Sequence, residues 1–135
     1  MAHSAHKLIV NVTRRTVICD EATIADRVLS RVRGLLGRTE MRRGEGLLLS
    51  PAPSIHTAFM RFPIDAIFLN RERQVVKLVP SMKPWRAAAA REAHAVLELE
   101  AGAISRRGVR VGDTLQVLDL RAWDTRSPEV SRARH

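Results

Sequence analysis

The sequence has a single cysteine, Cys19, and no tyrosine among its 135 residues. One cysteine excludes an intramolecular disulfide, and thiolate-based structural zinc sites usually need at least two. Cys19 lies in the alternating run TVICDE (16–21), and no neighbouring histidine is placed to lower its pKa. We therefore expect a buried structural thiol there and not a nucleophile.

Long apolar runs are also missing. No stretch approaches the ~20 apolar residues that a transmembrane helix needs. The run that follows Lys7 is shorter than the ~7–15-residue apolar region of a secretory signal. We expect a soluble, cytoplasmic protein with no membrane span, unless the opening MAHSAH replaces a natural leader.

Lysine and acidic residues are few compared with arginine. The chain carries 20 Arg and 3 Lys against 14 Asp and Glu, a formal net charge of +9. Basic chains bind nucleic acids by neutralising phosphates, but here the arginines are spread along the whole chain. The three phenylalanines lie in an apolar segment, where we expect core packing and not base stacking. Nucleic-acid association is therefore an alternative and not the leading hypothesis.

The apolar pattern predicts one β-rich domain over residues 1–122 and a flexible tail over 123–135. Strand-length runs occur at KLIVNV (7–12), RTVICDE (15–21), LLLS (47–50), QVVKLVP (74–80), HAVLELE (94–100) and TLQVLDL (114–120). Their spacing is typical of a mainly β (β-rich α+β) fold, and we expect a compact antiparallel sandwich or flattened barrel.

Two helices are expected within this domain. Apolar residues recur at positions 24, 28, 32, 35 and 36, which is the spacing of an amphipathic helix over about 24–36. Thr23 is suited to cap its start and Gly37 to end it. The segment AGAISRRG predicts a short helix near 101–107 that ends at Gly108.

The segment SPAPSIHTAFMRFPIDAIFLN (50–70) places polar side chains in a very apolar part of the chain. Because Pro63 favours a tight turn, we expect a hairpin of strands 54–61 and 64–70. In that register Met60 lies opposite Asp65.

The same register places His56 about 13 Å from Asp65, at ~3.3 Å per residue, which excludes a dyad across the hairpin. A Ser54–His56–Asp65 triad would lack a nucleophile elbow, and His56 with His94 matches no known metal-ligand spacing. We expect His56 to be hydrogen bonded in or beside the core. Asp65 should accept backbone N–H bonds or pair with Arg61 or Arg86, because an unpaired buried carboxylate is too costly.

The tetrapeptide KPWR (83–86) places Trp85 and Arg86 on an irregular connection. An indole beside a fixed cation suits a small anionic or planar ligand. The alternative is that Trp85 plugs one end of the β-structure while Arg86 pairs with an acid.

The ordered series RVRGLLGR, GEGLLLSPAPSIHTAFMRFPIDAIFLN, QVVKLVPSMKPWR and AVLELEAGAISRRGVRVGD resembles the family called domain of unknown function 192, from about Thr16 to Val117. The resemblance implies a compact, mainly β fold with a helix on it and no established activity. Relatives often have a cysteine near the position of Ala52, so chemistry that requires that thiol is not expected here. The resemblance marks as residues of interest Ser54, His56, Thr57, Met60, Arg61, Pro63, Asp65, Trp85 and Arg86.

Three functions are compatible with these residues. The leading hypothesis is a non-catalytic module that binds a small ligand or a protein partner near Trp85, Arg86 and Met60. An enzyme would use His56 as acid or base and Arg61 or Arg86 as an anion clamp. A basic nucleic-acid-associated protein is the third. Because no residue pair has the spacing of a known catalytic unit, we assign no catalytic residue, metal site or cofactor, and we favour a protein that is not an enzyme.

Overall fold

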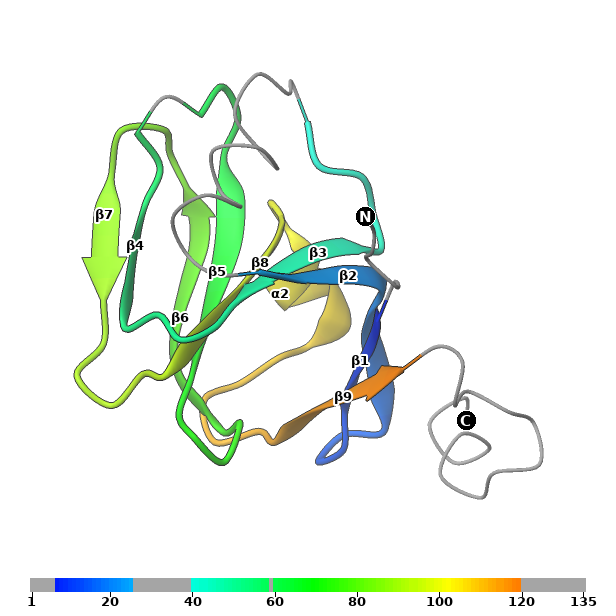
Figure 1. Ribbon diagram of the computed structural model, residues 1–135. Coiled ribbons are helices and arrows are strands. Elements are labelled where there is room, and N and C mark those ends of the chain that lie inside the picture. The colour runs from blue at the N-terminus through cyan, green and yellow to red at the C-terminus, as the bar shows by residue number, and fades with distance from the viewer. Residues whose placement is uncertain (1–6, 26–39, 59, 120–135) are drawn as a thin grey trace.

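The computed structural model describes residues 7–25, 40–58 and 60–119. In these ranges the chain forms strands and one short helix (Figure 1). The elements are β1 (Lys7–Asn11), β2 (Thr16–Ala25), β3 (Glu45–Leu49), β4 (Ser54–His56), β5 (Ile64–Leu69), β6 (Val75–Met82), β7 (Ala87–Ala89), β8 (Ala95–Glu100), α2 (Ala103–Arg107) and β9 (Leu115–Asp119).

Seven strands form one curled sheet in the order β6-β5-β8-β3-β2-β1-β9, and β4 pairs with β7 in a separate two-stranded sheet. The strands at the two ends of this order also meet. Gln74 forms an antiparallel bridge with Thr114, and the Leu115 N–H donates to the Arg73 carbonyl at 2.9 Å. The large sheet is thus joined at one end into a flattened half-barrel, which confirms the predicted mainly β class.

Strands β3, β5 and β8 run between two apolar clusters. Along β5, Ile67 and Leu69 pack in the cluster that includes Ile104 of α2, whereas Ala66 and Phe68 pack in the cluster that lies against β4 and β7. All six residues of β5 and all six of β8 are buried. Near-continuous apolar runs are typical of strands covered on both faces.

The predicted strands at 7–12, 15–21, 47–50, 74–80, 94–100 and 114–120 are confirmed, with small shifts at their ends. The short helix is confirmed as α2, which ends at Gly108 with a φ of 67°. The amphipathic helix predicted over about 24–36 begins too early, since residues 24 and 25 close β2. Its remainder and the predicted tail over 123–135 lie outside the described residues. No helix in the described part of the chain is long and apolar enough to cross a membrane.

The hairpin predicted from strands 54–61 and 64–70 is wrong. β4 is three residues long and pairs with β7, where His56 lies opposite Ala87. β5 pairs with β6 on one side and β8 on the other. A strand that is apolar on both faces belongs inside a large sheet, and the short segment before Pro63 instead crosses to a second layer.

Asp113 fastens the joined end of the barrel. Its Oδ2 accepts hydrogen bonds from Asn11 Nδ2 at 2.8 Å, from Arg14 Nε at 2.8 Å and from the Arg110 N–H at 2.9 Å. Burial by itself would raise the pKa of Asp113, but the bonds from Arg14, Asn11 and the Arg110 N–H outweigh it and lower the pKa. The ionised carboxylate therefore ties the turn after β1 to the turn before β9.

We expect this tie to make folding stability sensitive to acid. A lowered native pKa contributes stability that is complete above about pH 3.9, the ordinary aspartate value, and that is lost as the pH falls through the lower native pKa. Chemical unfolding of the Asp113→Asn variant should show a shallower loss of stability over this range than the wild type. The exposed Glu72→Gln substitution is the control. Parallel curves for the wild type and Asp113→Asn would contradict the prediction.

Candidate functional site: a pinned tryptophan turn

The turn of residues 83–86 connects β6 to β7 and presents Trp85 to solvent. The Trp85 side chain is 61% exposed, and its backbone has a φ of 63° in the left-handed region. A bulky residue rarely adopts this conformation, because it costs on the order of 1–3 kcal/mol. It persists only where contacts with the surrounding structure impose it. The surroundings of this turn are therefore informative.

Thr57 holds the turn at both of its ends. Its buried Oγ1 donates to the Lys83 carbonyl at 2.6 Å and accepts from the Arg86 N–H at 2.8 Å. The backbone N–H of Thr57 donates to the Arg86 carbonyl at 2.8 Å, and its carbonyl accepts from the Trp85 N–H at 3.0 Å. One fully buried threonine thus fixes three of the four residues of the turn.

Asp65 holds the strand that leads into the turn. Two residues of β6, Pro80 and Ser81, occupy the irregularity opposite Asp65, and Ser81 has a φ of 48°. Asp65 Oδ1 accepts from the Ser81 N–H at 2.8 Å, and Oδ2 accepts from the Ile104 N–H in α2 at 2.8 Å. The side chain is 0% exposed. The expectation that Asp65 accepts backbone N–H bonds is confirmed, and its partners are Ser81 and Ile104, not Arg61 or Arg86.

His56 lies at the exposed end of β4, opposite Ala87 and next to Thr57. Its Nδ1 accepts the Ala58 N–H at 3.3 Å, so a neutral ring carries its proton on Nε2. The ring is hydrogen bonded as expected, but it is exposed and not part of the core. Both oxygens of Asp65 are bonded to backbone N–H groups, so Asp65 does not serve His56 as the orienting carboxylate of a dyad.

The other predicted residues divide between the surface and the core. Arg61 and Arg86 are exposed, and Arg86 Nη1 donates to the Trp85 carbonyl at 3.3 Å and not to an acid. Met60 is buried in the cluster beneath the two-stranded sheet. Ser54 is exposed at the opposite end of β4, facing Ala89. The structure therefore brings His56 and Thr57 to the turn and leaves Ser54 away from it.

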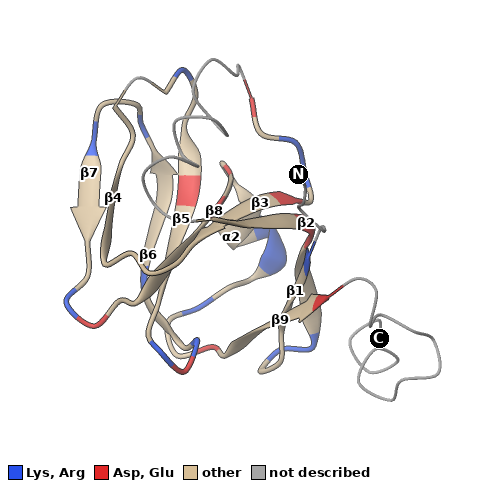
Figure 2. Cartoon of the chain, in the orientation of Figure 1, with Lys and Arg blue, Asp and Glu red and all other residues tan. Residues whose placement is uncertain are grey.

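The segments that build this end of the molecule contain no acid. Residues 50–64 and 81–91 carry Arg61, Lys83, Arg86, Arg91 and the histidine at 56, without a single Asp or Glu. In Figure 2 the upper end of β7 shows blue and no red, and the red on nearby β5 belongs to its one acid, which is buried. The electrostatic field at the turn is therefore attractive to anions. The sequence analysis did not single out Lys83, although it lies inside the KPWR motif.

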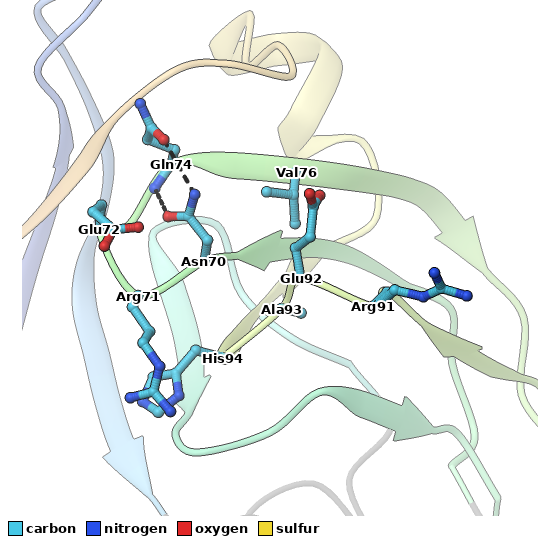
Figure 3. Close-up of a pocket in the computed structure, with 9 residues that line it drawn as sticks. All are labelled: Asn70, Arg71, Glu72, Gln74, Val76, Arg91, Glu92, Ala93 and His94. Carbon is cyan, nitrogen blue, oxygen red and sulfur yellow. Dashed lines mark hydrogen bonds between the residues drawn. The ribbon is translucent and has the colours of Figure 1, made fainter.

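A hollow of about 660 Å³ lies at the other end of β5 and β7, between the turns at 70–74 and 91–94. Figure 3 shows its lining, which mixes both charges: Asn70, Arg71, Glu72, Gln74, Val76, Arg91, Glu92, Ala93 and His94. The side chains of Asn70 and Gln74 bond to each other at 3.1 Å, so they serve mainly to hold their own turn. The sequence analysis missed this hollow, because the two turns that form it are far apart in the chain.

Cys19 is buried in the cluster that packs against α2. Burial, and then the charge of Asp20, raise the pKa of its thiol to about 12, so it stays protonated at neutral pH. This confirms the expected structural thiol. In the described part of the chain, no three His, Cys, Asp or Glu side chains are grouped so as to hold a metal ion.

Two relatives of this chain carry the family designation UPF0127. The UPF0127 protein PF1050 of Pyrococcus furiosus is 35% identical over 116 residues, which cover 80% of this chain and 96% of the relative. A UPF0127 protein of Thermococcus sibiricus is 30% identical over 113 residues, covering 80% of this chain and 73% of the relative.

Two crystal structures share the fold. A protein of unknown function from Novosphingobium aromaticivorans superposes with a TM-score of 0.69 and 23% identity, covering 85% of this chain and 93% of that one. A protein from Sinorhizobium meliloti described as a candidate transcription regulator gives a TM-score of 0.68 and 23% identity, covering 87% and 98%. Residues 9–117 match the sequence profile of domain of unknown function 192, described as "Uncharacterized ACR". This match spans most of the chain, and the protein belongs to that family.

Proposed function

We propose that this protein is a non-catalytic binding module that engages an anionic partner through the turn of residues 83–86, with His56 beside it. The observation that carries the proposal is the exposure of Trp85, whose backbone is held in a left-handed conformation by the hydrogen bonds of Thr57. Tryptophan and arginine are the side chains most enriched in the energetic centres of protein interfaces. A rigid turn loses little conformational entropy when it binds.

The chemistry of the turn favours recognition over catalysis. Asp65 is committed to Ser81 and Ile104, and within the described ranges no other carboxylate is seen to bond to the exposed histidine. The cations at 61, 83 and 86 lie on segments free of acids and complement a carboxylate-rich or phosphate-rich surface. Because Trp85 is 61% exposed, a partner can cover much of its surface.

Binding of a fluorescein-labelled polyglutamate peptide, measured by fluorescence polarisation, tests this proposal. We expect Trp85→Ala and Arg86→Gln each to weaken binding by about tenfold, the equivalent of one charge-assisted or hot-spot contact. The control is Arg110→Gln, which removes the same charge from an exposed turn elsewhere. Equal losses in Arg86→Gln and Arg110→Gln would show that only the net charge of the surface matters and would reject the site.

A second candidate is nucleic-acid binding, which the description of the Sinorhizobium meliloti protein and the basic charge of the chain both support. Duplex DNA replaces the peptide in the same assay. DNA recognition requires an affinity that falls linearly with salt on logarithmic axes, and a slope reduced by about one in Arg86→Gln. Absence of DNA binding at low salt, with polyglutamate bound, rejects this candidate and retains the first.

A further inference from the structure

We propose that the outer edge of β7 accepts an extended acidic peptide as an additional strand, with Trp85 and Arg86 contacting its side chains. This inference rests on the proposed function and names the form of its partner. In the part of the chain that the structure describes, β7 pairs with β4 alone. Figure 1 shows β7 at the outer margin of the molecule, directly after the tryptophan turn.

The register of the two-stranded sheet defines which backbone groups face outward. The Thr57 N–H donates to the Arg86 carbonyl, and the Ala90 N–H donates to the Pro53 carbonyl. In an antiparallel pair, hydrogen-bonded positions alternate, so residues 86, 88 and 90 direct their backbone groups toward β4. The N–H and C=O groups of Ala87 and Ala89 consequently point away from β4, and both residues are exposed.

The side chains along this edge leave room for another strand. β7 consists of three alanines, which present no bulk or charge against an incoming backbone. Lys77 Nζ donates to the Ala89 carbonyl at 2.8 Å and so covers the far end of the edge. Charged lysines protect sheet edges in this way from unspecific pairing. The open portion is therefore the end at Ala87, adjacent to Trp85.

Strand addition explains why an exposed tryptophan and a bare edge occur together. Backbone hydrogen bonds to an edge provide affinity with little sequence preference, and neighbouring side chains provide the specificity. Here the indole offers an apolar contact, while Arg61, Lys83 and Arg86 select for acidic residues. The partner is therefore an extended segment with acids next to an apolar or aromatic residue.

A phage-displayed library of random seven-residue peptides, selected on the immobilised full chain, supplies the probe. We expect the enriched sequences to contain acidic residues and no proline in their central positions. Amide hydrogen exchange by NMR is then followed with the synthesised peptide at saturation. Protection of the Ala87 amide should rise about tenfold or more, whereas the Ala88 amide, already bonded to β4, should change little.

The outcomes separate this inference from the proposed function. If the peptide requires Trp85 but leaves the Ala87 amide unprotected, strand addition is wrong and the binding module stands. If selection yields no acidic peptide while polyglutamate binding still depends on Trp85, strand addition is again rejected. If neither probe depends on Trp85, both proposals fail. Ala87→Pro, which removes one outward N–H, should weaken the selected peptide but not polyglutamate.

Discussion

Replacing Asp65 by alanine should lower the free energy of unfolding by about 2–5 kcal/mol. The substitution removes the acceptor of the buried Ile104 N–H and of the partly buried Ser81 N–H. Each buried donor that loses its partner costs roughly 1–3 kcal/mol. Chemical denaturation of the two proteins under identical conditions measures the difference.

Asp65→Asn offers a graded control because it keeps the shape and one carbonyl acceptor. Its amide NH₂ faces a backbone N–H where the wild type has an oxygen. The free energy of unfolding of Asp65→Asn should therefore lie between those of the wild type and Asp65→Ala. Glu72→Ala removes an exposed carboxylate and should stay within about 0.5 kcal/mol of the wild type. A chemical denaturation curve of Asp65→Ala that matches that of Glu72→Ala would mean that the backbone donors find other partners.

Thr57→Val is the second substitution with a large expected effect. Valine preserves the volume but removes the hydroxyl that donates to the Lys83 carbonyl and accepts from the Arg86 N–H. We expect the free energy of unfolding to fall by about 1–3 kcal/mol, because two partly buried backbone groups lose their partner. We also expect the tryptophan turn to loosen, because the left-handed conformation of Trp85 loses the contacts that impose it.

Trp85 reports on this loosening by its own fluorescence once Trp123 is replaced by phenylalanine. In that background, Thr57→Val should lower the fluorescence anisotropy of Trp85 and weaken polyglutamate binding. Thr57→Ser keeps the hydroxyl and should restore both properties. If Thr57→Val destabilises the fold yet leaves anisotropy and binding unchanged, Thr57 supports the fold without organising the site.

Local patterns predicted the strands well but not their partners. The runs at 7–12, 94–100 and 114–120 are strands because their apolar residues fit buried positions. The hairpin failed because β6 and β8 occupy both edges of β5, which leaves no edge for the segment before Pro63. The sequence IDAIFL has no polar alternation beyond one aspartate, and this was the available sign of a central strand with partners on both sides.

Prediction of the site succeeded where it rested on the free-energy cost of burying an unpaired charge. It failed where it needed to know which residues lie close together in three dimensions. A buried carboxylate must be satisfied, and Asp65 is. Nothing in the spacing of residues 57 and 86 indicated that Thr57 would bond to both ends of a turn almost thirty residues away, because that contact depends on β4 crossing to a second sheet.

The pairing of β1 with β9 also affects the order in which the sheet can form while the chain is synthesised. β1 precedes β9 in the chain, yet β9 is one of its two neighbours, and the bond from Lys7 to Asp119 spans 112 residues. At roughly 5–20 residues per second, about 6–22 s pass on the ribosome before that neighbour exists. Throughout this interval the β1 edge stays open to foreign strands. The half-barrel is therefore completed only after β9 has been synthesised.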